Sequence, residues 1–205
     1  MAKRIAKKIL WIGWDGADWK VINPMIEKGY MPNLEKFINQ GVMGNLATLD
    51  PPMSPTLWTA MSCGKRPYKH GIHGFTEIDP SGDSVRPCQV SSRKVRAIWN
   101  MMKLKGMKCH QVGWWPSHPA EPTNGIYISN MYQKANKNPK DWPLAPGAVH
   151  PPEMVDLFAD MRVHPKQLTP AHLQPFIRNL DSFDHKEQKN KKLLNSVNKL
   201  SLIHI

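Results

Sequence analysis

The chain has 205 residues, 40% of them hydrophobic, and eight are tryptophans, a composition that excludes a disordered protein. This length allows one domain with a buried core, or one domain and part of another. The formal net charge of +12 fits a solubilising surface, nucleic-acid binding or attraction of a phosphorylated substrate, and the lack of an aromatic-interleaved basic groove disfavours nucleic acid.

The first predicted element is a strand over residues 9–14, a short apolar run that ends at Asp15. The run is too short for the core of a signal peptide or for a membrane span, so we expect a cytoplasmic chain that does not cross a membrane. Three cysteines without Cys-x-x-Cys spacing predict reduced thiols, which fits the same compartment.

Helical and strand-like patterns then alternate along the chain. Gly29, Gly41 and Gly106 each follow an apolar helical pattern and are expected to end a helix. The predicted elements are helices over 21–26 and 32–38, a strand over 42–49, a helix over 95–102 with Ser92 as its cap, and strands over 107–114 and 126–129. This alternation predicts an α/β domain with a mainly parallel sheet flanked by helices.

Residues 130–152 have no periodicity, and we expect a long loop there that connects into an inserted subdomain. Helical patterns resume over 153–161, 170–177 and 184–200. The predicted organisation is therefore an α/β unit over 1–130 and a loop-rich, helical cap or insert segment over 131–205.

Asp15 is the first candidate site residue because it follows the first predicted strand, in the turn WDGAD. Ligand sites gather at the carboxyl ends of strands in open parallel sheets, so a carboxylate here can reach a metal or a substrate. Asp-Gly is also ordinary turn chemistry, and the residues alone leave both interpretations open.

Ser54 is the second candidate. Proline is favoured at the first helical position and serine just before it, so Ser54 is predicted to be the N-cap of a helix over 55–62. The hydroxyl can serve only as a cap, but the same geometry places it at the positive end of a helix dipole, which stabilises an alkoxide and binds phosphoryl oxygens. The hydroxyls further along this helix are poorer nucleophile candidates.

Three competing motifs give no site. The sequence GKR at 64–66 is not a P-loop, because position 59 is threonine and no Ser or Thr follows the lysine, and no Gly-x-Ser-x-Gly elbow is present. His70 and His73 lie between glycines without further ligands nearby, which favours a structural role, or a role in supporting ligands from behind, over direct metal binding.

WIGWDGADW, followed by MPNLEKFINQGVMGNLATLDPPMSPTLWTAMSCGKRPYKHGIHGF, resembles the type I phosphodiesterase/nucleotide pyrophosphatase family of the alkaline phosphatase superfamily, from about Ile9 to Phe75. The segment VRAIWNMMKLKGMKCHQVGWWPSHPAEPTNGIYIS looks like the next region of that family. The resemblance implies an alkaline phosphatase-like fold, two divalent metal ions, commonly zinc, and a Ser or Thr nucleophile. Matched residue by residue, Asp15 is the first metal ligand, and Ser54 is the nucleophile that also touches a metal.

The function that this resemblance implies is hydrolysis of phosphoric esters through a phosphoseryl intermediate, with a small phosphorylated substrate. Nucleotide-cleaving members commonly place an asparagine three residues after the nucleophile, where this chain has Leu57. The Cys/Ser-x-Pro-x-Arg signature of sulfatases is absent. The alternative is a non-catalytic basic module that binds phosphorylated ligands or nucleic acid.

The remaining family ligands come from later Asp and His motifs, including an Asp-His-Gly triplet that this sequence lacks. Asp184-His185 is followed by lysine, and the last residues stop inside a helical pattern without a glycine or a cap. The final LSLIHI is what one frame of a common library-preparation adapter would translate to. We therefore expect an N-terminal fragment with an incomplete sheet, and no turnover by these 205 residues alone.

Overall fold

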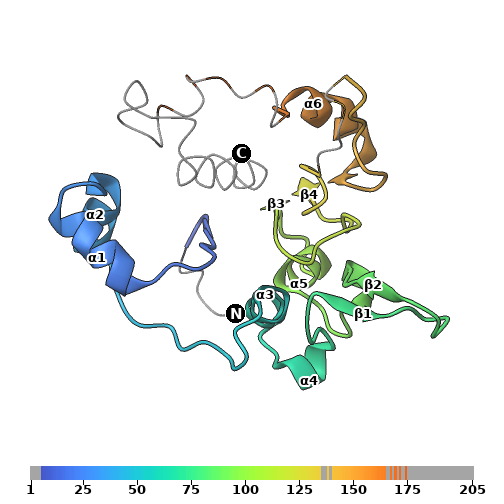
Figure 1. Ribbon diagram of the computed structural model, residues 1–205, viewed down its shortest axis with the longest axis horizontal. Helices are drawn as coiled ribbons and strands as arrows, with labels where there is room; N and C mark the ends of the chain where they lie inside the picture. Colours follow the sequence, from blue (N-terminus) through green and yellow to red (C-terminus); the bar gives the residue numbers. More distant parts are fainter. Residues whose placement is uncertain are drawn as a thin grey trace, which may run out of the picture. The chain divides into compact units, whose positions relative to one another are not determined.

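The computed structural model describes residues 6–134, 138, 140–164, 167, 169, 171 and 174 (Figure 1). The chain divides into two compact units, Met1–Thr48 and Leu49–Ile205, which we describe separately. The helix expected over 184–200 lies outside the described residues, and the helix expected over 170–177 lies almost wholly outside them.

The first unit contains the two predicted helices. Helix α1 spans Trp19–Glu27 and α2 spans Pro32–Asn39. The Asp18 carboxylate caps α1 by accepting from the Lys20 N–H at 2.8 Å. Gly29 follows α1 at φ +69°, a left-handed conformation that stops a helix, as the sequence predicts.

The strands expected over residues 9–14 and 42–49 are not formed, and that prediction is wrong. Ile9 and Leu10 are 84% and 85% exposed, and neither segment pairs with another in the described part of the chain. A strand exists only when its backbone N–H and C=O groups bond to a neighbouring segment, which an apolar run cannot supply by itself.

The second unit has a mixed α/β arrangement. Strands β1 (Thr76–Ile78) and β2 (Val85–Pro87) form an antiparallel hairpin. Strands β3 (Gln111–Val112), β4 (Tyr127–Ile128) and β5 (Val149–His150) form a separate sheet in that order. The other elements are α3 (Ser54–Cys63), α4 (Pro67–His70), the 3₁₀ turn η1 (Val90–Ser92), α5 (Ile98–Leu104), the 3₁₀ turn η2 (Pro152–Met154) and α6 (Val155–Asp160).

A mainly parallel sheet is not what the described residues show. β3 and β4 are parallel, with Gln111 opposite Tyr127, whereas β4 and β5 are antiparallel, with Tyr127 opposite His150. β5 also lies inside residues 130–152, where only loop is predicted. Its two residues are too few to show a hydrophobic period, so their strand pairing is fixed by β4 and not by a local pattern.

Helix α5 starts later than predicted. Its N-cap is Ala97, whose N–H donates to Asn100 Oδ1 at 2.8 Å. Ser92 is therefore not the cap: its hydroxyl instead accepts from the Gln89 N–H at 2.9 Å and donates to Glu77 at 2.7 Å. Gly106, at φ +67°, ends the helix as predicted.

Aromatic side chains connect α3 to the rest of the second unit. Trp58 on α3 meets Trp114 edge-on, with ring centroids 5.0 Å apart. Trp114 contacts Trp99 of α5 at 6.1 Å, and Trp99 contacts Tyr127 of β4 at 5.7 Å. Such edge-to-face pairs each contribute about 0.5–1.5 kcal/mol beyond area burial. This chain of rings holds α3 against α5 and β4.

A second buried cluster joins Ile128, Tyr132, Ala148 and Val149, with η2 and α6 packed on it. This cluster draws side chains from both sides of residue 130. The domain boundary expected at that position stays a prediction.

Candidate functional site

Ser54 is the first residue of α3, and Met53 occupies the N-cap position. The helix thus starts one residue earlier than predicted, although the hydroxyl still lies in its first turn. Pro55 follows, and proline suits the first turn because the N–H that it lacks would have no hydrogen-bond partner within the helix. Met53 N–H donates to the Pro51 carbonyl at 2.9 Å, a tight turn that leads the chain into the helix. Ser54 is half-buried.

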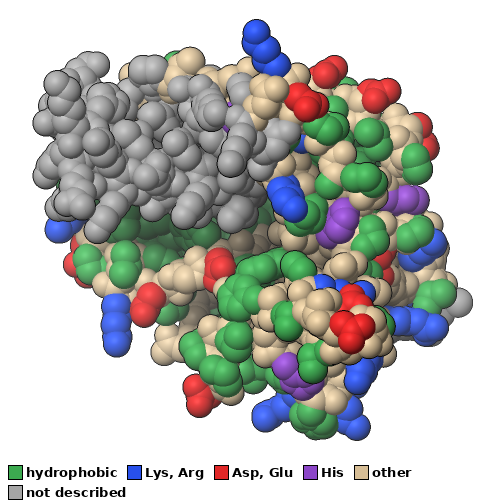
Figure 2. All heavy atoms as spheres, turned by 45° about the vertical axis from the view of Figure 1, so that its right-hand side comes forward, with side chains coloured by type: hydrophobic (Ala, Val, Ile, Leu, Met, Phe, Trp, Pro, Cys, Tyr) green, Lys and Arg blue, Asp and Glu red, His purple; other side chains and the backbone are tan. Residues whose placement is uncertain are grey.

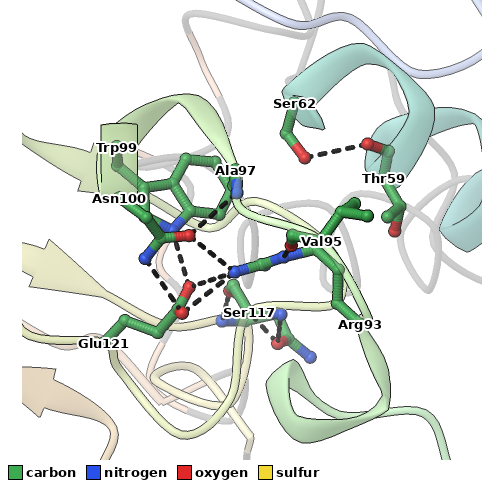
Figure 3. Close-up of polar contacts among 10 residues, drawn as sticks. Thr59, Ser62, Arg93, Val95, Ala97, Trp99, Asn100, Ser117 and Glu121 are labelled. Atoms are coloured by element: carbon green, nitrogen blue, oxygen red, sulfur yellow. Dashed lines mark hydrogen bonds and ion pairs between the residues drawn. The ribbon is translucent and has the colours of Figure 1, made fainter. Parts of the chain in front are cut away.

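Two other hydroxyls of α3 are bonded to backbone carbonyls of the helix itself, as expected for poor nucleophiles. Thr59 Oγ1 donates to the Pro55 carbonyl at 2.7 Å. Ser62 Oγ donates to the Thr59 carbonyl at 3.0 Å (Figure 3). Both side chains are buried, and so is Thr56. Trp114 Nε1 donates to the Trp58 carbonyl at 2.8 Å, which fixes the helix further.

His70 ends α4 and is completely buried. Its Nδ1 accepts from the Ile72 N–H at 3.1 Å, so the proton of the neutral ring is on Nε2. Burial lowers the pKa of His70, and the positive charge of nearby His73 lowers it further. A neutral, buried ring agrees with the structural role predicted for this histidine.

A buried ion pair between Arg93 and Glu121 was not predicted from the sequence. Arg93 Nη2 lies 2.9 Å from Glu121 Oε2, with the two side chains 6% and 17% exposed. Glu121 also accepts from Trp99 Nε1 at 2.6 Å and from Asn100 Nδ2 at 3.0 Å. Figure 3 shows these groups converging on one carboxylate. The network ties the loop that carries Glu121 to the start of α5, and 28 residues separate the two charges, so no local pattern could have indicated it.

The cysteines are not nucleophile candidates. All three are free, as predicted. Burial raises the pKa of the Cys88 and Cys109 thiols, which keeps them protonated and poorly nucleophilic at neutral pH.

Asp15 lies in the first unit, in the turn after residues 9–14, where Gly16 has φ +69°. The described residues contain no group of three or more His, Cys, Asp or Glu side chains placed to hold a metal ion. The residues present therefore do not by themselves fit the expected two-metal centre. The assignments of Asp15 as ligand and of Ser54 as nucleophile and ligand stay predictions.

Helices in the described part of the chain are all too short or too polar to cross a bilayer. A family model for type I phosphodiesterase/nucleotide pyrophosphatase matches residues 9–199. No curated protein and no solved structure matches the sequence. The match covers most of the chain, including the turn after residues 9–14 and the whole of α3. The chain belongs to the type I phosphodiesterase/nucleotide pyrophosphatase family, which is a family of hydrolases.

Proposed function

We propose that this chain carries the nucleophile of a phosphoric-ester hydrolase and that Ser54 is that nucleophile. The observation that carries the proposal is the position of Ser54 as the first residue of a ten-residue helix inside the family match. The positive end of the helix dipole lowers the cost of the alkoxide that must form and favours the anionic phosphoryl group.

The proposed reaction has two steps. The Ser54 oxygen attacks phosphorus while its proton passes to a base, and the bond from phosphorus to the leaving-group oxygen breaks to give a phosphoseryl intermediate. Water then attacks the same phosphorus, and the bond to Ser54 Oγ breaks, which restores the hydroxyl and releases phosphate or a monoester. The buried, ring-anchored α3 keeps Ser54 in one position through both steps.

The proposal includes metal dependence, with two divalent ions, commonly zinc in this family, and with Asp15 and Ser54 as ligands. A catalytic zinc normally has about three protein ligands. The described residues supply no third one, and the two steps above are written without a metal.

We propose a small phosphorylated substrate. Leu57, three residues after Ser54, is half-buried in the first turn of α3. A leucine cannot donate a hydrogen bond to a phosphoryl oxygen, whereas a side-chain amide can. The chain therefore lacks one contact by which nucleotide-cleaving relatives hold their substrate.

The test uses the full-length protein, loaded with zinc. Ser54→Ala should abolish metal-dependent hydrolysis of a generic phosphomonoester and phosphodiester, because a covalent nucleophile is lost. Thr59→Ala is the matched control, since it removes a hydroxyl of the same helix that is bonded to a backbone carbonyl. Hydrolysis by Ser54→Ala at the wild-type rate would refute the assignment.

A further inference from the structure

An open cleft of about 370 Å³ lies on the second unit. Two stretches of chain form its walls, one just before α3 and one just after it. The lining residues are Leu49, Asp50, Arg66, Pro67, Tyr68 and His73.

The cleft adjoins the start of α3. Asp50, on one wall, is four residues before Ser54. On the other wall His73 precedes Gly74, and the Met53 side chain packs on Gly74 so closely that a Cβ there would lie 3.2 Å from Met53 Cε. Met53, the residue that caps α3, thus packs against the neighbour of a residue that lines the cleft.

The wall after α3 is held in place by buried contacts. The His70 carbonyl accepts from the Lys94 N–H at 2.9 Å, and Ile72 is fully buried. Gly71 turns the chain at φ +82°, with the Lys94 side chain packed over it. Arg66 and His73 are therefore displayed from a preformed frame, which lowers the cost of ordering them around a ligand.

The charged side chains that line the cleft form no ion pair in the described part of the chain. The ion pairs among the described residues are those of Arg86 and Arg93, and Arg66 belongs to neither. Lys69 lies beside the cleft, with Nζ 5.6 Å from the centroid of the Tyr68 ring. Figure 2 shows Lys and Arg side chains, a histidine and an acidic side chain along the lower edge of the view. Positive groups outnumber the single carboxylate of Asp50 around this cleft.

We propose that this cleft binds an anionic group, a phosphate or a carboxylate. The Arg66 guanidinium can hold two oxygens of such a group at once, and His73 offers a ring N–H. Asp50 repels the anion and confines it to the Arg66 side of the cleft. The cleft can bind an anion whether or not the chain is an enzyme. Its role as a subsite for the substrate rests on the proposed function.

The test measures binding of inorganic pyrophosphate to the 205-residue chain by titration calorimetry at constant ionic strength. Arg66→Gln should weaken binding by about tenfold or more, because a bidentate charge-assisted contact is lost. Lys103→Gln, which removes one exposed positive charge on α5 outside the cleft, should change the affinity by less than about twofold. Asp50→Asn should tighten binding.

Arg66→Lys keeps the positive charge but cannot make the two parallel hydrogen bonds of a guanidinium. Its affinity for pyrophosphate should lie between those of the wild type and Arg66→Gln, which distinguishes loss of a specific contact from a folding defect in Arg66→Gln. Absence of pyrophosphate binding by the wild-type chain would overturn the proposal. Equal weakening by Arg66→Gln and Lys103→Gln would also overturn it, because only a diffuse positive field would then be acting. Ser54→Ala should bind pyrophosphate as the wild type does, so loss of hydrolysis and loss of anion binding are separate results.

Discussion

Replacing Glu121 by alanine tests whether the buried network holds the second unit together. The carboxylate accepts from Arg93 Nη2 on both oxygens at 2.9 Å, from Trp99 Nε1 at 2.6 Å and from Asn100 Nδ2 at 3.0 Å. Without it, the Arg93 guanidinium, whose side chain is 6% exposed, is left as an unpaired charge away from water. Breaking a buried pair in this way costs about 3–5 kcal/mol, and the unmet Trp99 donor adds to it.

The assay is urea unfolding followed by tryptophan fluorescence, with the free energy of unfolding extrapolated to water. Asp79→Asn is the control, because the Arg86–Asp79 pair is longer, at 3.7 Å, with side chains 29% and 31% exposed. Loss of such a surface pair costs about 0–1 kcal/mol, and the asparagine keeps the side-chain acceptor for the Ser81 N–H. Glu121→Gln, which retains one acceptor oxygen, should lie between the two. If Glu121→Ala costs no more than Asp79→Asn, the network does not stabilise the unit.

The remaining predictions concern three other positions. In the full-length protein, Asp15→Asn should weaken metal binding, because a neutral amide is a poorer ligand for a divalent ion. Unchanged zinc affinity by competition titration would return Asp15 to the role of a turn residue. The lowered pKa of His70 means that the unfolded chain binds its proton more readily, so stability should be full above about pH 6.5 and fall as the pH drops below it. The free energy of unfolding, measured from pH 8 to 5, should fall with this slope in the wild type and less steeply in His70→Gln. Some slope should remain in the variant because burial also lowers the pKa of His118. Equal slopes in the two proteins would refute the role of His70. Gly125→Ala should destabilise the sheet, because the new Cβ would collide with the Cys109 carbonyl oxygen, and thermal unfolding at the wild-type temperature would contradict this.

The helices could be predicted because their determinants are local. Apolar residues at helical spacing and a following glycine place α1, and a proline in the first turn places α2 and α3, each within a residue or two. Ser92 is predicted to cap α5 but does not, because its hydroxyl donates to Glu77, 15 residues away. Propensity could not reveal that competing bond.

The strands and the buried network depend on distant partners, and for that reason they were poorly predicted. Residues 9–14 have the composition of a buried strand but no neighbouring strand in the described part of the chain. β5 has a partner in β4 but no pattern of its own. The sequence singles out Ser54 because its position combines a helix start with a family motif, and its role as nucleophile stays a prediction. Arg66 and His73 carry no spacing that indicates a site, and only the folded frame after α3 brings them to one cleft.

The central claim, that Ser54 is the nucleophile, is tested most directly by trapping the intermediate. The full-length protein is mixed with an activated phosphomonoester in molar excess, quenched in acid within the first turnover and digested for peptide mass spectrometry. The account predicts one phosphoryl group on the α3 peptide, located by fragmentation at Ser54, and its absence in Ser54→Ala. A phosphoryl group on another residue, or hydrolysis that proceeds in Ser54→Ala, would contradict it.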